Sequence, residues 1–511
     1  MPIQTVMDGS SLLVQFSAIL LASLASILFI SWAGRRVLGK KSRLALPPGP
    51  RGLPLVGYLP FLGTELHLTF AKLARIYGPI FKVWVGKKMY VVLSSPDVVR
   101  EVVREKDVIF ANRDPGVASR LITYGANDIA FRDYGAEWRK MRKIFAHKML
   151  GNATLDASFE LRRGVVEKSV KEVYKQVGEP VRIGGVGLMT VVNSMMATIW
   201  GSWDDGGATD WRGLLGEMMV LIAAPNVSDF FPTLAWLDLQ GIAGRMRGVF
   251  DQLEAVFEVA IARIRSRSKG EGDMNLLRYL MGLQDGEDPT SALSMTQIKG
   301  MLIDTAVGGT DTTSTIFEWT LTELLLHPQE MKAVQDELTR VVGLNNLVIE
   351  SHLSELKYLE AAVKETMRIH PAFPLLVPRR PSEETQVGGY TIPKDATVFV
   401  NAWAIHRDPS LWDDPLEFRP KRFLDGAEKW DFSGNDLRYL PFGSGRRICP
   451  GLPLAERALM YTLAVILHSF NWEVPKGAKI GLEEKFGIVM KKREPLVAIP
   501  SPRFSNLEIY G

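Results

Sequence analysis

The stretch FGSGRRICPG at residues 442–451 contains Cys449, the only cysteine among 511 residues. A single cysteine can form neither a disulfide within the chain nor a multi-cysteine zinc site. Gly445 and Gly451 allow a tight loop around the thiol, because glycine adopts backbone conformations that other residues avoid. Arg446 and Arg447, three and two positions before the cysteine, place positive charge near the sulfur, which favours the thiolate. A buried structural cysteine is the alternative, but these surroundings favour a thiolate with a chemical role.

These residue types suit a cysteine that binds haem iron. Glycines let a backbone approach a flat cofactor, and backbone N–H groups in such a loop donate to the sulfur. A thiolate on haem iron pushes electron density toward oxygen and favours cleavage of the O–O bond. The stretch resembles the Phe-x-x-Gly-x-Arg-x-Cys-x-Gly signature of the cytochrome P450 superfamily, which it matches at Phe442, Gly445, Arg447, Cys449 and Gly451. The resemblance implies that these residues bind haem b and that Cys449 is the axial ligand of its iron.

The composition excludes several other classes of protein. The chain has 61 basic and 57 acidic residues, and its net charge of +4 is too weak to indicate a nucleic-acid-binding surface. Hydrophobic residues make up 46% of the chain, enough for a large core. The histidines form no His-x-x-x-His pair that would indicate a metal site on a helix. A chain without disulfides fits a catalytic domain in a reducing compartment.

The N-terminal region predicts a membrane anchor and a stiff linker. Residues 11–33 are largely apolar and carry no charge, and in a helix they would span roughly 35 Å, enough to cross a bilayer. Basic residues follow this run and only Asp8 precedes it, so residues 1–10 are expected in the lumen. A cleaved secretory signal is the alternative, but it needs positive charge before the apolar run. Residues 34–57 are expected to form a basic, proline-rich linker, and residues 58–511 a cytosolic catalytic domain.

The remainder of the chain predicts one mainly helical domain with small β-sheets. Residues 81–94 alternate and turn at a Gly-Lys pair, a pattern typical of a β-hairpin. Residues 387–400, punctuated by glycine and proline, predict another short sheet region. Residues 247–267 and 329–342 have helical periodicity. The resemblance implies the cytochrome P450 fold, in which a large helical domain with minor sheets holds haem between two core helices.

A second motif, GGTDTT at residues 308–313, lies inside the largely apolar run 301–326. Two adjacent glycines weaken a helix by about 1 kcal/mol each, so we expect something to approach the backbone and the helix to widen locally. The motif resembles the oxygen-binding helix of cytochromes P450. The resemblance implies that Thr312 hydrogen-bonds the oxygen being activated and that Asp311 relays protons to it from water. The alternative is a glycine-kinked core helix whose threonines bond only to the backbone.

Two further motifs predict a buried ion network. Glu365 and Arg368 are spaced i and i+3, so they lie on one helix face, although such pairs often occur by chance. In cytochromes P450 a third partner comes from a Pro-x-Arg-Phe motif, which here supplies Arg422. The resemblance implies that the three side chains lock the cysteine loop to the core. Breaking the network should release haem, because a lone buried charge is destabilising.

Several residues are expected to bind the carboxylate groups of haem. Trp138 and Arg142 are spaced i and i+4, so they project from one helix face. The resemblance implies that this pair binds a haem propionate and that Arg379 and Arg447 bind propionates as well. Arginine suits the task, since its planar guanidinium grips carboxylates in a bidentate manner. For any single arginine the alternative is a solvated surface charge.

Seven apolar residues are expected to line the substrate pocket. The resemblance implies this only loosely, because substrate contacts follow a weaker pattern in the family than the haem-binding motifs do. The seven residues are Ala306, Val307, Phe373, Leu375, Leu376, Phe486 and Ile488. Their character predicts a lipophilic substrate, although most ligand pockets are apolar.

Several longer stretches of the sequence resemble those of plant microsomal cytochromes P450. The stretches that carry this resemblance include PPGPRGLPLVG (47–57), FANRDP (110–115), LVPRR (376–380) and AIHRDPSLWDDPLEFRPKRF (404–423). The combination of GGTDTT with EKFGIVMKK (484–492) most resembles the plant group that includes sesquiterpene and flavonoid hydroxylases.

The resemblance implies a monooxygenase of plant secondary metabolism that inserts one oxygen atom from O₂ into a small lipophilic metabolite. Electrons from NADPH are expected to arrive through NADPH–cytochrome P450 reductase in the endoplasmic-reticulum membrane, with cytochrome b5 as a second candidate donor. We predict a terpenoid substrate, with a flavonoid or another phenolic as the alternative. Two other functions stay open: a reductase-independent haem-thiolate isomerase or dehydratase, and a non-catalytic haem-binding membrane protein. The intact motifs around Thr312 and Cys449 speak against both.

Overall fold

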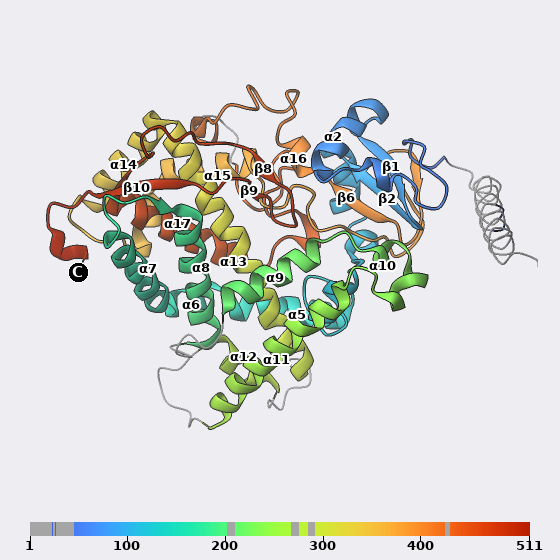
Figure 1. Cartoon of the computed structure of the whole chain (residues 1–511), viewed down its shortest axis with the longest axis horizontal. Helices are drawn as coiled ribbons and strands as arrows, with labels where there is room; N and C mark the ends of the chain where they lie inside the picture. The colour runs from blue at the N-terminus through green and yellow to red at the C-terminus, as the bar shows by residue number, and fades with distance from the viewer. Residues whose placement is uncertain are drawn as a thin grey trace, which may run out of the picture.

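The computed structural model describes Ser23, Ser26 and residues 45–201, 210–266, 275–284, 292–424 and 430–510. The predicted lumenal segment 1–10 lies outside the described residues. So do the predicted anchor 11–33, apart from those two serines, and the first part of the predicted linker. Over the described ranges the chain is mainly helical with small sheets, as the sequence predicts (Figure 1).

The helices are α2 (Leu66–Tyr77), α3 (Pro96–Arg100), α4 (Val117–Ile122), α5 (Ala136–Ile144), α6 (Asn152–Ala157), α7 (Phe159–Tyr174), α8 (Ile183–Trp200), α9 (Trp211–Ala223), α10 (Val227–Phe230), α11 (Ile242–Ser266), α12 (Leu276–Gln284), α13 (Met295–Leu326), α14 (Pro328–Val342), α15 (Lys357–Ile369), α16 (Ala402–Ile405) and α17 (Leu452–Ser469). The helical predictions for 247–267 and 329–342 are confirmed, since these residues lie in α11 and α14 to within one position.

Helix α13 runs through the middle of the helical part of the molecule (Figure 1). Its first turn is a capping box, in which Ser294 and Gln297 each bond the other's backbone N–H, and it continues unbroken to Leu326. The predicted local widening at the two glycines is therefore wrong. Gly309 instead allows α8 to approach closely, because a Cβ there would lie 2.6 Å from the sulfur of Met195.

The small sheets confirm both strand predictions. Strands β1 (Ile80–Val85) and β2 (Lys88–Leu93) form the hairpin, and Gly86 in its turn has a φ of 56°. Strand β6 (Thr397–Val400) pairs in parallel with β2, so the end of the predicted 387–400 region joins the hairpin's sheet, while its first residues lie in a separate two-stranded sheet. The remaining strands are β3 (Val181–Arg182), β4 (Thr385–Val387), β5 (Tyr390–Ile392), β7 (Phe470–Glu473), β8 (Glu484–Lys485), β9 (Lys491–Lys492) and β10 (Val497–Pro502), in the sheets β3-β10-β7, β4-β5 and β8-β9.

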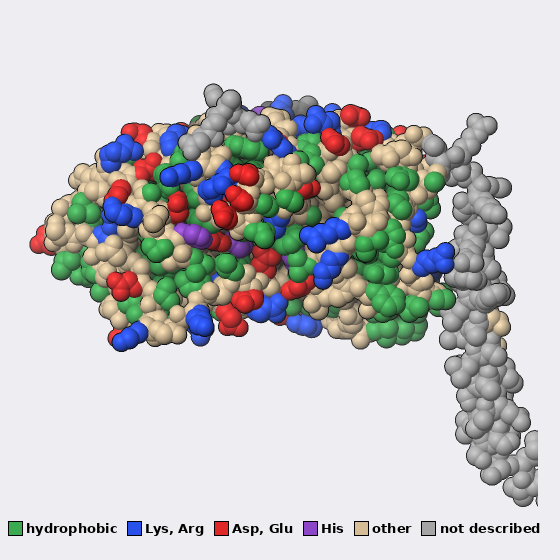
Figure 2. Space-filling view, turned by 90° about the horizontal axis from the view of Figure 1, so that it is seen from above, with side chains coloured by type: hydrophobic (Ala, Val, Ile, Leu, Met, Phe, Trp, Pro, Cys, Tyr) green, Lys and Arg blue, Asp and Glu red, His purple; other side chains and the backbone are tan. Residues whose placement is uncertain are grey.

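Among the described residues, α8 alone is long and apolar enough to cross a membrane, but 61% of it is buried. Because it packs along α13, we interpret it as a core helix. Hydrophobic side chains gather on the surface toward the end of the molecule that carries β1 and β2, whereas charges of both signs are spread over the rest (Figure 2). At the β1 end the chain exposes Leu53, Leu55 and Phe61, each by 41% to 51%.

Candidate active site

The loop that carries Cys449 is formed by tight backbone turns that end at the start of α17. A 3₁₀ turn spans Gly445–Arg447, and the Cys449 N–H donates to the carbonyl of Phe442 at 3.0 Å. Gly445 has a φ of 71°, and a Cβ there would lie 2.6 Å from the carbonyl oxygen of Val103. Only glycine fits this position without strain. Gly451 has a φ of −81°, so its backbone carries no such requirement.

Opposing influences act on the Cys449 thiol. Burial is the largest influence and leaves the pKa of the thiol above its ordinary value, although the backbone N–H groups of Gly451 and Leu452 and the guanidinium of Arg142 act to lower it. These N–H groups lie at the N-terminus of α17, whose dipole also favours negative charge. A metal ion bound to the sulfur would remove the proton outright. The loop therefore directs N–H donors and a cation at the sulfur, which suits a thiolate ligand.

One face of α13 is open where the glycine motif lies. Gly308 is exposed although its neighbours along the helix are buried or partly buried, and a Cβ there would meet nothing within 4 Å. Thr312, one turn later, is partly exposed, and its hydroxyl donates to the carbonyl of Gly308 at 2.7 Å. Helix α17, which begins at the cysteine loop, packs against α13. An open face on the helix that neighbours the cysteine loop fits a flat cofactor.

Trp138, Arg142 and Arg447 lie together beside the cysteine loop. The Arg447 guanidinium is 4.4 Å from the centre of the Trp138 ring. Both side chains donate to the carbonyl of Ile129, Arg447 at 2.9 Å and Trp138 at 3.0 Å. Arg142 donates to the carbonyl of Ile448 at 2.6 Å, so it binds the loop one residue before the cysteine.

Arg379 and Arg113 complete a cluster of four guanidinium groups. Arg379 pairs with Asp107 at 2.8 Å and donates to a carbonyl of the cysteine loop at 2.7 Å. Arg113, which sequence reasoning did not assign to the site, donates to the carbonyl of Pro378 at 2.7 Å. Its Nε has no hydrogen-bond partner among the described residues. Burial and the nearby Arg447 and Arg379 hold the pKa of Arg113 well below its ordinary value.

The arginine cluster (Arg113, Arg142, Arg379 and Arg447) fits the carboxylates of haem. An anion bound here would reduce the repulsion among the four cations and would accept a hydrogen bond from the unpaired Nε–H of Arg113. Guanidinium groups bind carboxylates in a bidentate manner. The thiol, the open helix face and the arginine cluster thus match the iron, the ring and the propionates of haem. The residues present fit this cofactor.

Glu365, Arg368 and Arg422 lie in direct contact. Arg368 Nε is 2.7 Å and its Nη2 2.9 Å from the two carboxylate oxygens of Glu365, and both residues are fully buried. Arg422 Nε lies 2.8 Å from the same carboxylate. Arg368 also donates to the carbonyls of His406 and Pro415, at 2.7 and 2.8 Å. The network therefore ties α15 to the segment 406–422, and its role in haem retention stays a prediction.

His406 connects this network to the chain just before the cysteine loop. Its Nε2 accepts a hydrogen bond from the N–H of Leu440 at 2.8 Å. Burial, together with Arg368 and Arg407, lowers the pKa of His406 from 6.5 to about 3. The imidazole is therefore neutral near neutral pH, as it must be to accept from Leu440.

The pKa of His406 makes the stability of the protein fall in mild acid. The unfolded state takes up a proton below 6.5, whereas the folded state does not until about 3, so lowering the pH favours unfolding between these values. At about pH 5.5 the loss is roughly 1.4 kcal/mol relative to about pH 7.5. In His406→Gln, whose amide oxygen can still accept from Leu440, thermal unfolding should lack this part of the loss. His468, whose pKa burial lowers to about 4, contributes the same loss of stability to wild type and to His406→Gln, so it cancels in the comparison. If the two proteins lose equal stability in acid, the prediction is contradicted.

Two aspartates of α13 lie in different surroundings. Asp311 is buried, and its carboxylate is 2.7 Å from Lys491 Nζ. Asp304 accepts the N–H of Ile129 at 2.6 Å. Burial and the adjacent Asp128 raise the pKa of Asp304 well above its ordinary value, and burial raises that of Asp128 to about 6. Both carboxyls therefore have raised pKa values, and Asp304 fastens the Ile129 segment to α13, a feature that no motif marks.

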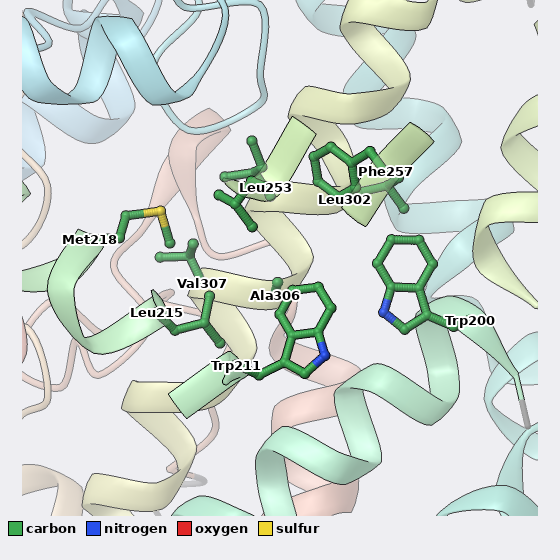
Figure 3. Close-up of a pocket in the computed structure, with 10 residues that line it drawn as sticks. Trp200, Trp211, Leu215, Met218, Leu253, Phe257, Leu302, Ala306 and Val307 are labelled. Carbon is green, nitrogen blue, oxygen red and sulfur yellow. The ribbon is translucent and has the colours of Figure 1, made fainter. Parts of the chain in front are cut away.

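The seven predicted pocket residues fall into separate regions. Ala306 and Val307 line an apolar cavity between α8, α9, α11 and α13 (Figure 3). Leu375 and Phe486 share a second apolar cluster, and Leu376 packs against a third. The remaining two, Phe373 and Ile488, are partly buried. The cavity is also lined by Trp200, Trp211, Leu215, Met218, Leu253, Phe257, Leu302 and Ile303, which sequence reasoning missed.

Ala306 lies on the side of α13 away from the open face. Helical residues are about 100° apart around the axis, so position 306 points roughly opposite to Gly308. Its 8% exposure agrees with this placement. The cavity of Figure 3 and the open face at Gly308 are therefore on different sides of one helix.

The family is shown by comparison with known proteins. The model of the family "Cytochrome P450" matches residues 47–499, and the chain belongs to this family. Members of the family are monooxygenases that use haem, O₂ and electrons from NADPH delivered by a reductase, so the predicted enzyme class and cofactors are confirmed at this level.

Individual relatives point to plant metabolism. A flavonoid 3'-monooxygenase of Crocosmia x crocosmiiflora is 39% identical, over 90% of this chain and 93% of its own. A geraniol 8-hydroxylase of Swertia mussotii is 37% identical, over 89% of this chain and 94% of its own. Among solved structures, a zebra fish cytochrome P450 with abiraterone superposes with a TM-score of 0.73 at 28% identity, covering 86% of this chain and 99% of its own. The predicted resemblance to plant cytochromes P450 is confirmed.

Proposed function

We propose that this cytochrome P450 hydroxylates the aromatic ring of a flavonoid or a closely related phenolic. The observation that carries the proposal is the similarity to the Crocosmia flavonoid 3'-monooxygenase, which extends over 90% of the chain. This similarity favours a flavonoid over the terpenoid substrate that the sequence predicts. A terpenoid alcohol is the second candidate, because the geraniol 8-hydroxylase is 37% identical over a similar length.

Each part of the candidate site has a proposed task in holding the cofactor. Haem, when bound, supplies the redox chemistry that splits O₂ with electrons from NADPH. Cys449 provides the thiolate, and the N–H groups of Gly451 and Leu452 stabilise its charge. The arginine cluster binds the propionates, with Trp138 stacked on Arg447. Phe442, whose carbonyl accepts from the Cys449 N–H, helps fix the loop.

Two residues of α13 are proposed to supply protons to the reacting oxygen. Thr312 has its hydroxyl on the open face, where it can give up its bond to the Gly308 carbonyl and bond to the oxygen instead. Asp311 is buried next to it in the chain and takes up protons from water for delivery along this face. A mutant that lacks either group should consume NADPH without forming product in proportion.

The membrane and partner assignments are proposals for the whole chain. The apolar run 11–33 would anchor it in the endoplasmic-reticulum membrane with residues 58–511 in the cytosol, and the exposed apolar residues at the β1 end suit contact with lipid. NADPH–cytochrome P450 reductase in the same membrane would deliver the electrons, with cytochrome b5 as a second donor. The reductase-independent isomerase and the non-catalytic alternatives are disfavoured, since the relatives are named monooxygenases or hydroxylases.

The substrate is tested by expressing the full chain in microsomes with a plant reductase and NADPH. Flavanones, flavones and monoterpene alcohols are offered in parallel, and products are analysed by mass spectrometry under isotopically heavy O₂. We expect a flavonoid to gain one heavy oxygen atom on its ring, and reactions without reductase to give none. Oxidation of the monoterpene alcohols alone would overturn the flavonoid assignment in favour of the second candidate.

A further inference from the structure

Asp311 forms one ion pair within the described part of the chain, and its cation comes from the C-terminal hairpin. Lys491 Nζ, on β9, lies 2.7 Å from Asp311 Oδ2. The Asp311 side chain is 10% exposed, whereas that of Lys491 is 45% exposed. The pair therefore bridges the interior side of α13 and the solvent.

The placement of the Asp311 carboxylate depends on this lysine. No group among the described residues makes an aligned hydrogen bond to Asp311 Oδ2, so its contact with Lys491 is electrostatic. A buried carboxylate without other partners is unfavourable unless a cation compensates it. Glu318, two turns further along α13, differs: it accepts the backbone N–H groups of Leu496 and Gly184. Backbone donors hold Glu318, whereas within the described residues the ion pair with Lys491 holds Asp311 Oδ2.

The backbone next to Lys491 is fixed to α13 by its neighbours. The Met490 N–H donates to the carbonyl of Ala372 at 2.9 Å, and the Trp319 indole N–H approaches the Met490 carbonyl at 3.4 Å. Lys492 Nζ lies 4.5 Å from the centre of the Trp319 ring. Because residues on both sides of Lys491 are held, its side chain starts from a defined position.

The partner strand β8 is anchored as firmly. The carboxylate of Glu484 is 3.2 Å from His370 Nδ1, 3.2 Å from Trp403 Nε1 and 3.2 Å from Arg407 Nη2. Burial by itself would raise the pKa of Glu484, but the hydrogen bond to His370 and the contact with His67 at 3.5 Å hold it below its ordinary value. Glu484 is thus a fixed anion that secures the hairpin bearing Lys491.

We propose that Lys491 is a positioning residue for proton delivery. Its ammonium, 2.7 Å from Asp311 Oδ2, holds the carboxylate directed toward the solvent side, where water can reach it. Asp311 then takes one proton from water and passes one on toward Thr312, while Lys491 keeps its own proton throughout. The inference rests on the role proposed for Asp311 and adds a residue that no sequence motif marks.

The first test compares the wild-type holoenzyme with the variants Lys491→Met, Lys491→Arg and Lys485→Met, using the substrate that the microsomal test identifies. Lys485, on β8, lies opposite Lys491 in the hairpin and is exposed, so its variant removes the same charge from the same hairpin. We expect Lys491→Met to lower kcat roughly tenfold with KM unchanged, a fraction of the 10²- to 10⁴-fold loss for a proton-transfer group itself. Its solvent isotope effect on kcat should rise, Lys491→Arg should recover most of the rate, and Lys485→Met should behave as wild type. A wild-type kcat and isotope effect in Lys491→Met would overturn the proposal.

The second test does not depend on turnover. Thermal unfolding of the holoenzyme is measured for Asp311→Asn, Lys491→Met and the double variant. If the pair interacts as proposed, the double variant should lose less thermal stability than the sum of the single variants. Additive losses would overturn the proposal. Full turnover by Asp311→Asn would instead refute the role of Asp311, whereas an impaired Asp311→Asn beside a fully active Lys491→Met would refute Lys491 alone.

Discussion

Arg368→Leu is expected to yield protein that does not retain haem. The change leaves the fully buried Glu365 carboxylate without its bidentate partner and frees the carbonyls of His406 and Pro415. Breaking a buried ion pair from one side destabilises a protein by about 3–5 kcal/mol, which is a large part of a total of about 5–15 kcal/mol. The measurements are haem absorbance per chain and the melting temperature of the purified protein.

Two matched variants separate charge from geometry. Arg368→Lys keeps the charge but cannot form the two parallel bonds to Glu365, so we expect an intermediate loss. Arg419→Leu removes a nearby arginine whose side chain pairs with Asp413 and Asp414 at the surface, and we expect it to cost less than about 1 kcal/mol. If Arg368→Leu and Arg419→Leu keep haem equally well, the ion network does not secure the cysteine loop.

Asp311→Asn is expected to reduce product formation by roughly 10²- to 10⁴-fold, because losing a proton-transfer group has about this effect. The amide has nearly the same shape as the carboxyl, so haem content and the carbon-monoxide spectrum should stay normal. Product formed per NADPH consumed should fall, since reducing equivalents still enter while protons arrive slowly. Steady-state turnover and hydrogen peroxide release measure the two quantities.

The control for Asp311→Asn is Asp251→Asn. Asp251 is an exposed residue on α11, so its variant makes the same chemical change away from α13. We expect wild-type turnover from it. Equal turnover in Asp311→Asn and wild type would mean that protons reach the oxygen by another route, and Asp311 would lose its assigned task.

The elements that sequence reasoning located are those whose cause is local. A turn at Gly86 between two alternating runs requires a hairpin, and the i, i+3 spacing of Glu365 and Arg368 puts both on one helix face. The cysteine loop requires a glycine at position 445, where φ is positive and a side chain would collide with the backbone. Helical period alone could also have shown that Ala306 points away from Gly308.

What the sequence could not show are contacts between distant segments. Arg379 pairs with Asp107, which lies 272 positions earlier in the chain. Lys491, near the C-terminal end of the chain, pairs with Asp311 of α13. Neither pair has a characteristic spacing, because the fold brings each together. The predicted widening at residues 308–309 failed for a similar reason: Met195 of α8 takes up the space that Gly309 leaves, and nothing in the local sequence indicates that partner.

The central claim, that Cys449 holds the iron of haem as a thiolate, is tested most directly by the difference spectrum of the reduced, carbon-monoxide-bound protein. Wild type and Cys449→Ser are compared at equal haem content. We predict a Soret band near the wavelength for which the family is named in wild type, and its loss in Cys449→Ser. The same band in both proteins, or its absence from haem-loaded wild type, would contradict thiolate ligation by Cys449.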